Sequence, residues 1–243
     1  MIDIHAHILP NLDDGPLSLA EAVNLVREAK ADGITAIFAT PHAYKGVFHC
    51  TPEQILEKCS LLTEELRKQD IVMDIMPGSE VHLTNNVISH YDNGRLLTLN
   101  NLGSHILLEL PEKFIFEAVT NILQDFAYRG VTVIIAHPER NTTLRKNVHL
   151  IPDMIDEGAM MQVTAASIVG GFGKKIMKIT EKMIANDHVT LVGSDIHPFR
   201  DFMMRKALRK VLLTAGRKTA EEIFKRNAES ILIPNEKRAY AAM

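Results

Sequence analysis

Short apolar runs rich in β-branched residues alternate along this chain with longer stretches in which apolar residues recur at helical spacing. Helix starts are indicated at residues 18–21 and 51–54, and glycine ends helices at Gly33, Gly130 and Gly158, directly before the next apolar run. The pattern predicts seven strands, at residues 2–4, 34–39, 71–76, 106–110, 131–136, 160–163 and 189–192. Strands buried on both faces and separated by helices are typical of a parallel sheet. We therefore expect an α/β fold, a closed or nearly closed seven-stranded TIM-like (β/α) barrel.

Length and composition add a limit on the number of domains. With 243 residues, of which 46% are hydrophobic, the chain can bury one large core, and it shows no linker, low-complexity tract or break in composition. We expect a single domain over residues 1–243, with a polar tail from Pro234 to Met243 that frays.

Charge and leader patterns argue against several classes of protein. A net charge of −3 and a pI of about 6.4 give no electrostatic sign of binding to a polyanion, so we expect no nucleic-acid binding. There is no basic and apolar leader, and runs such as residues 133–136 are too short to span a bilayer. We expect a cytoplasmic protein without membrane insertion, and the two cysteines, Cys50 and Cys59, fit a reducing compartment.

Histidine, aspartate and glutamate side chains stand at the ends of six of the seven expected strands. In chain order these residues are His5, His7, His42, Glu80, Glu109, His137, Asp195 and His197. Active sites of parallel barrels lie at the carboxyl ends of the strands, where the βα loops converge. We expect all these side chains to lie together at that rim.

Such a group of imidazoles and carboxylates needs a compensating positive charge, because burying unpaired charge is costly. His5 and His7 point to the same face of a strand and can bind one ion. Mixed imidazole and carboxylate ligands without cysteine suit Mn, Fe, Zn or Mg. The number of ligands implies two or three clustered ions, which favours phosphoryl transfer or the hydrolysis of amide and C–N bonds. A structural role is expected for the remaining histidines, which are His49, His82, His90, His105, His149 and His188.

The motifs H-x-H at residues 5–7, T-P-H at 40–42, H-P-E-R at 137–140 and S-D-x-H at 194–197 form a distinctive set. The chain also opens with MIDIHxHILPxxDDG. In this stretch and these motifs it resembles the polymerase-and-histidinol-phosphatase (PHP) superfamily, and more closely its bacterial capsule and exopolysaccharide branch of protein-tyrosine phosphatases. The resemblance implies a distorted seven-stranded barrel. It also implies a trinuclear, manganese-loaded phosphatase that removes phosphate from the tyrosine-rich tail of a kinase controlling polysaccharide assembly.

The resemblance also assigns roles to individual residues. It implies one ion held by His5, His7, Glu80 and Asp195, a second by Glu80, Glu109 and His137, and a third by Asp14, His42 and His197. The choice of Asp14 over the adjacent Asp13 rests on the motif alone. Arg140 is expected to hold phosphate oxygens. The family's second phosphate-binding arginine lies slightly farther beyond the D-x-H motif, where this chain is about two residues shorter. Arg200 is matched to it, and Arg205 is the alternative. His42 or His197, if protonated, is expected to assist the tyrosinate leaving group.

Other nucleophiles and other functions were weighed against this hypothesis. Neither Cys50 nor Cys59 is followed by the arginine of a C-x5-R phosphate loop, and there is no G-x-S-x-G serine elbow. A histidinol-phosphate type of small-molecule phosphatase would use the same metal rim, and a metal-loaded regulatory module without turnover would also retain it. A metal-dependent amidohydrolase is disfavoured, because those enzymes usually present a bridging lysine where this chain has Glu109.

Overall fold

The computed structural model describes residues 1–233, so the expectation for the tail lies outside the described residues. The strands are β1 (Ile2–Ala6), β2 (Ala36–Ala39), β3 (His42–Lys45), β4 (Phe48–His49), β5 (Asp74–Pro77), β6 (Glu80–His82), β7 (His105–Glu109), β8 (Thr132–Ala136), β9 (Met160–Thr164) and β10 (Leu191–Gly193). The helices are α1 (Leu19–Ala31), α2 (Pro52–Lys68), α3 (Val87–Asp92), α4 (Phe116–Tyr128), α5 (Thr142–Lys146), α6 (Leu150–Asp156), α7 (Ala165–Val169), α8 (Lys174–Ala185), α9 (Met204–Thr214), α10 (Gly216–Glu221) and α11 (Asn227–Ile231). Short turns of helix lie at η1 (Leu99–Asn101) and η2 (Glu222–Arg226).

The strands form two sheets. One has three strands in the order β1-β2-β5, and the other has seven in the order β10-β9-β8-β7-β6-β3-β4. All described pairings are parallel except that between β3 and β4. The two sheets also meet where β1 and β10 end. There, Asp195 N–H donates to the His5 carbonyl at 2.8 Å, and His7 N–H donates to the Ile196 carbonyl at 3.1 Å.

Each of the seven predicted strands is confirmed, although several begin two or three residues later than expected. The short strands β3, β4 and β6 were not predicted. Pro41 separates β2 from β3, and Gly78 separates β5 from β6, so the segments after them resemble loops in the sequence. In the described residues, the strand pairings do not run continuously around one ring, and the architecture is a mixed α/β fold.

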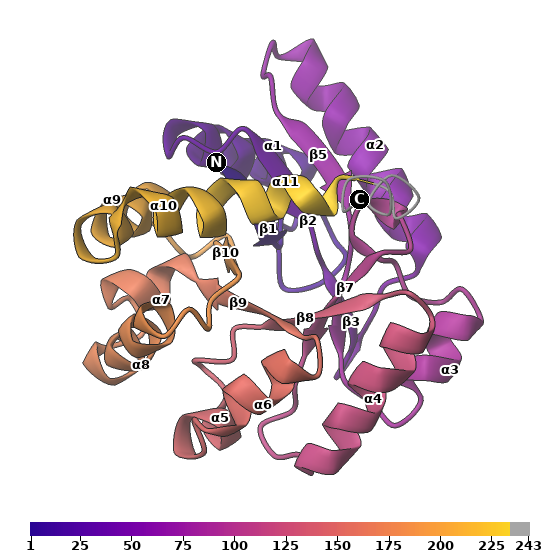
Figure 1. Ribbon diagram of the computed structural model, residues 1–243. Coiled ribbons are helices and arrows are strands. Elements are labelled where there is room, and N and C mark those ends of the chain that lie inside the picture. The colour runs from indigo at the N-terminus through magenta and orange to yellow at the C-terminus, as the bar shows by residue number, and fades with distance from the viewer. Residues whose placement is uncertain (234–243) are drawn as a thin grey trace.

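One apolar cluster in the interior contains side chains from both sheets. Apolar side chains from β1, β2, β5, β7, β8 and β10 pack in one buried cluster, exemplified by Ile4, Phe38, Leu107 and Leu191, and α11 covers it with Ile231. A larger apolar cluster lies between the strands and the helices, which surround the strands in Figure 1. Helix signals in the sequence are confirmed at α2, where Thr51 and Gln54 form a reciprocal capping box. None of the helices within residues 1–233 is long and apolar enough to cross a membrane.

Candidate metal centre

All nine predicted ligands come together near the carboxyl ends of β1, β2, β5, β7, β8 and β10. In chain order they are His5 on β1, His7 and Asp14 after it, His42 on β3, Glu80 on β6, Glu109 ending β7, His137 after β8, and Asp195 and His197 after β10. Seven of them are buried, and Glu109 is partly buried. The Asp14 side chain is 46% exposed. The cluster is therefore open to solvent on the side of Asp14.

The tautomers of His5 and His7 are fixed by neighbours. His5 Nδ1 donates to the Gln162 Oε1 at 2.9 Å, and His7 Nδ1 donates to Asp13 Oδ2 at 2.6 Å. The two Nε2 atoms lie 3.2 Å apart, and 3.4 and 3.5 Å from Glu80 Oε2. In the neutral form of each imidazole, which is the form that binds a metal, Nε2 carries the lone pair, and the two lone pairs then face each other and a carboxylate oxygen. Such an arrangement of lone pairs is typical of histidines that bind a metal through Nε2.

Glu80 lies at the centre of the cluster. Its Oε2 is 2.7 Å from His42 Nδ1, yet both buried atoms lack a hydrogen-bond partner of acceptable geometry. Its other oxygen, Oε1, is 2.8 Å from His137 Nε2, and His137 Nε2 is 3.9 Å from Glu109 Oε1. Two close, unpaired ligand atoms in a buried site are the pattern expected where ligands share an ion.

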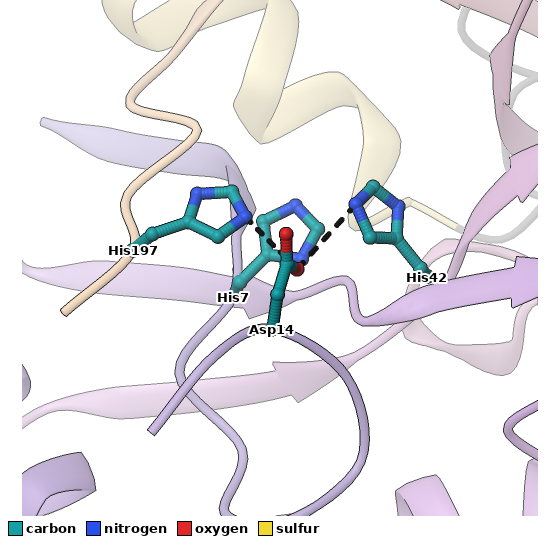
Figure 2. Close-up of side chains that lie close together, drawn as sticks. All are labelled: His7, Asp14, His42 and His197. Atoms are coloured by element: carbon teal, nitrogen blue, oxygen red, sulfur yellow. Dashed lines mark hydrogen bonds and ion pairs between the residues drawn. The ribbon is translucent and has the colours of Figure 1, made fainter. Parts of the chain in front are cut away.

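A second part of the cluster surrounds Asp14 (Figure 2). Asp14 Oδ1 lies 3.2 Å from His197 Nε2 and 3.6 Å from His42 Nε2, and the His7 ring lies beside it. Asp13, in contrast, points inward, where its carboxylate accepts hydrogen bonds from His7 Nδ1 and the His42 and Gly15 N–H groups. The adjacent aspartates thus differ in position, with Asp14 among the ligand atoms and Asp13 behind them.

Three groups of ligand atoms are close enough to hold an ion. They are His7, Asp14, His42 and His197; His5, His7 and Glu80; and His42, Glu80 and Glu109. These overlap with the three sets implied by the resemblance. The differences are that His7 and His42 each belong to two groups, whereas His137 and Asp195 belong to none of the three. His137 contacts Glu80 and Asp195 contacts His7, so both lie at the edge of the cluster.

The pKa values show the negative potential of the buried carboxylates. Burial alone would lower the pKa of His7, but hydrogen bonds with Asp13, Asp195 and Glu80 raise it well above its usual value. Burial would raise the pKa of Glu80, but the neighbouring imidazoles, His5 first, hold it well below its usual range. Burial and the positive His7 lower the pKa of His197 to about 4. Protons on imidazoles therefore supply the positive charge that divalent ions would supply when bound.

Three cationic side chains border the cluster. Lys45 Nζ donates to Glu109 Oε1 at 2.8 Å and lies 3.2 Å from His42 Nε2. Arg140 donates to Asp195 Oδ2, and Arg200 donates to the same oxygen at 3.1 Å. Arg205 lies elsewhere, because its side chain donates to the Ala31 and Asp32 carbonyls at the end of α1. Of the two alternatives for the second phosphate-binding arginine, only Arg200 lies at the cluster.

The backbone is strained at two of the predicted ligands. His137 has φ = 34° and Asp195 has φ = 51°, a left-handed region that non-glycine residues rarely adopt and that is common at functional sites. Beside Asp195, Gly193 permits a close approach of strands, since a Cβ there would lie 2.7 Å from the His5 Cβ. The strand ends are therefore shaped to bring ligands from β1 and β10 together.

Several residues around the ligands were missed by the sequence reasoning. Asp13 and Gln162 orient histidines, and Glu139 accepts hydrogen bonds from Thr164 N–H and the Ser167 hydroxyl. Glu139 stands within the H-P-E-R motif, which could have pointed to it, whereas Gln162 is 157 residues from its partner and carries no sequence signal.

Two more residues have contacts that the sequence did not reveal. His82, assigned a structural role, contacts Glu109 Oε2 through Nδ1 at 3.0 Å. The Phe172 ring packs on both arginines, with its centroid 4.6 Å from the Arg140 guanidinium carbon and 5.6 Å from that of Arg200. Phe172 lies in a glycine-rich loop between α7 and α8, at the rim of the cluster.

Comparisons with known proteins identify the family of this chain. A family model for capsular polysaccharide synthesis, CpsB/CapC, matches residues 1–233. Tyrosine-protein phosphatase YwqE of Bacillus subtilis is 34% identical over 210 residues, which cover 86% of this chain and 82% of YwqE. The putative tyrosine-protein phosphatase CapC of Staphylococcus aureus is 30% identical over 239 residues, which cover 98% of this chain and 92% of CapC.

Solved structures support the same relationship. A crystal structure from a study of YwqE of Bacillus subtilis and CpsB of Streptococcus pneumoniae, described as unique metal-dependent tyrosine phosphatases, matches with a TM-score of 0.90 and 31% identity. The match covers 97% of this chain and 94% of that one. The histidinol phosphate phosphatase of Lactococcus lactis matches with a TM-score of 0.60 at 12% identity, covering 92% of this chain and 96% of that one, and shares the fold.

Proposed function

Because this chain belongs to the CpsB/CapC family of capsular polysaccharide synthesis, we propose that it is a metal-dependent protein-tyrosine phosphatase. Its substrate is phosphotyrosine on a tyrosine kinase that regulates capsule or exopolysaccharide synthesis. The observation that carries the proposal is the pair of Nε2 lone pairs of His5 and His7, directed at each other and at Glu80 Oε2 in a buried site. Relatives of this chain are named tyrosine phosphatases, which supports the substrate class.

Two or three divalent ions, manganese in our proposal with iron or zinc as alternatives, fit this donor set. Glu80 would be shared between ions, because each of its oxygens lies near a different imidazole nitrogen. The other ligands proposed are His5, His7, Asp14, His42, Glu109, His137, Asp195 and His197. Bound ions of this kind supply an activated water and polarise the phosphoryl oxygens.

Arg140 and Arg200 are proposed to bind the phosphoryl oxygens. Both guanidinium groups converge on Asp195 Oδ2, so both can reach a phosphate placed at that edge of the cluster. Their planar donors suit a bidentate contact with phosphate. Phe172 packs on both groups and holds them at the rim, and it offers an aromatic face to the tyrosine ring of the substrate.

The chain's own acids and nucleophiles limit the chemistry further. Burial raises the pKa values of Cys50 and Cys59 to about 12, so neither forms a thiolate at neutral pH. The lowered pKa of His197 in the metal-free protein suits a neutral ligand, and His42 and His197 are the two candidates to assist the leaving group. Little assistance is needed, since tyrosine has a pKa of about 10. No covalent phosphoenzyme is expected.

The proposal also covers architecture and context. We infer that residues 1–243 form one domain and that the two sheets are parts of a distorted seven-stranded barrel. A shared inner cluster from both sheets supports this inference. We further propose that the protein acts in the cytoplasm on the phosphorylated tail of its kinase partner. Binding of nucleic acid is not part of the proposed function.

The test compares substrates on the manganese-loaded protein. Phosphate release is measured from a tyrosine-phosphorylated kinase-tail peptide and from histidinol phosphate, each with and without a chelator. We expect rapid, chelator-sensitive release from the peptide and little from histidinol phosphate. Release from histidinol phosphate alone would show a small-molecule phosphatase, and no release from either would favour a regulatory module; both results contradict the proposal.

A further inference from the structure

A groove outside the metal centre combines an apolar floor with a basic rim. It lies between α8 and the segment containing α5 and α6, which are neighbours in Figure 1. Its volume is about 440 Å³. Its basic side chains are Arg145, Lys175, Lys178, Lys182 and His188, and its apolar side chains are Val148, Ile151, Ile179 and Met183. Among residues 1–233, no aspartate or glutamate lines it, although acidic residues outnumber basic ones in the whole chain, 30 to 27.

The sequence of α8 produces this surface through helical spacing. Lys175, Lys178 and Lys182 recur at intervals of three and four residues, so they share one face of the helix. Ile179 continues the same stripe, which places the lysine stems beside the apolar floor. The single acidic residue of α8, Glu181, is engaged elsewhere, with Lys210 Nζ at 2.6 Å.

The three lysines of the groove have no ion-pair partner in the described part of the chain. Lys175, Lys178 and Lys182 are exposed, and none forms an ion pair with another residue among 1–233. Arg145 Nε is buried without a hydrogen-bond partner, while its Nη2 donates to the Thr142 hydroxyl at 3.3 Å. A concentration of unpaired positive charge around apolar side chains is suited to an anionic ligand that also carries an apolar group.

Two segments that line the groove are close in sequence to residues at the side of the cluster where phosphate is proposed to bind. Helix α8 begins two residues after Phe172, which packs on Arg140 and Arg200, and Arg145 follows Arg140 by five residues. The lining residues extend along most of α8, from Lys175 to Asn186. At about 1.5 Å per residue this is about 16 Å, the length of about five residues of extended peptide.

We propose that this groove binds an acidic segment of the phosphorylated protein substrate, next to the phosphotyrosine that is hydrolysed. The inference rests on the proposed function and adds a second site, outside the metal centre, at which the protein binds its substrate. Acidic side chains pair with the α8 lysines, and one apolar side chain occupies the floor around Ile151 and Met183. A peptide fits better than a bilayer, because both floor residues are recessed and buried, where a flat lipid surface does not reach.

A binding assay tests the groove without turnover. A fluorescent peptide of acidic residues around one leucine, without phosphotyrosine, is titrated with the full-length protein by anisotropy. In the test variant, Lys175, Lys178 and Lys182 are each changed to Gln. In the matched control, which has the same change in charge, Lys30, Lys206 and Lys225 are changed to Gln; these lysines are exposed and lie on other elements. We expect about tenfold weaker binding for the test variant only.

Kinetics then link the groove to the substrate. For an acidic phosphotyrosine peptide, the test variant should raise KM about tenfold at unchanged kcat, and p-nitrophenyl phosphate turnover should not change. Val148→Ser, at a side chain that is 52% exposed, should weaken peptide binding about twofold by removing an apolar contact. If the wild type does not hydrolyse phosphotyrosine but binds the acidic peptide through these lysines, the proposed function fails and the groove stands.

Several results would overturn the inference. Equal binding by wild type and test variant would show that the lysines do not contact the peptide. Equal losses in the test and control variants would show a general effect of charge. If vesicles containing phosphatidylglycerol sediment the wild type but not the test variant, while peptide binding is unchanged, the groove is a lipid site and not a peptide site.

Discussion

The contrast between Asp13 and Asp14 provides a sharp test of how the cluster is built. Asp13 Oδ2 accepts from His7 Nδ1 at 2.6 Å and from His42 N–H at 2.9 Å, and its Oδ1 accepts from Gly15 N–H at 2.9 Å. All its partners are donors, and the carboxylate fixes the proton of His7 on Nδ1. Asp14 instead presents Oδ1 to the Nε2 atoms of two histidines.

Asp13→Asn removes one acceptor. In either orientation of the new amide, its NH₂ group faces at least one of these donors, so one hydrogen bond is replaced by a repulsive contact. Loss of a hydrogen bond to a charged group costs about 1.5–3 kcal/mol, and changes in residues that orient metal ligands typically cost 10- to 100-fold in metal affinity. We expect manganese affinity about 10- to 100-fold weaker, with an unchanged number of ions at saturation.

Competition between the metal-free protein and a chelator, combined with measurement of bound metal, checks this prediction. Asp14→Asn is the matched control, since it removes a proposed ligand from the neighbouring position and should lower the number of ions at saturation by one. If Asp13→Asn loses an ion while Asp14→Asn only weakens binding, the roles of the two aspartates are reversed and the reasoning is refuted.

Further predictions concern the phosphate side, the aromatic ring and buried charge. Arg140→Ala should lower kcat/KM for a phosphotyrosine peptide about 10²- to 10³-fold at unchanged metal content; a normal rate would exclude Arg140 from phosphate binding. Phe172→Ala should lower kcat/KM about tenfold for aryl phosphates but less for alkyl phosphates, and equal losses would show that the ring only supports the arginines. Burial raises the pKa of Asp3 from 3.8 to about 6, so its ionisation costs native stability as pH rises through that interval. The free energy of unfolding of metal-free Asp3→Asn, relative to that of the wild type, should therefore rise by up to about 3 kcal/mol between pH 4 and 7, as measured by denaturant unfolding. No rise would show that the Asp3 pKa is not raised.

The main strands could be predicted from the sequence because each is a β-branched run bounded by helix signals. The short strands β3 and β6 could not, because Pro41 and Gly78 precede them and each has four residues or fewer. Their existence matters, since they position His42 and Glu80 at the centre of the cluster. Strand pairing there depends on neighbours that are distant in sequence.

That the candidate ligands lie together could be predicted from the sequence, because histidine, aspartate and glutamate recur at the strand ends. Their environment could not, because the proton of His5 is fixed by Gln162, which is 157 residues away. The different positions of Arg200 and Arg205 also could not be predicted from the sequence. Their separation in sequence is small, yet Arg205 caps carbonyls at the end of α1, whereas Arg200 faces Asp195.

The central claim is that this cluster binds divalent ions that are required for phosphotyrosine hydrolysis. The most direct measurement titrates metal-free protein with manganese and records bound metal and phosphate release from a phosphotyrosine peptide in the same samples. We expect no release without metal and a rate that rises with occupancy until two or three ions are bound. Undiminished release by the metal-free protein, or no release by the fully loaded protein, would contradict it.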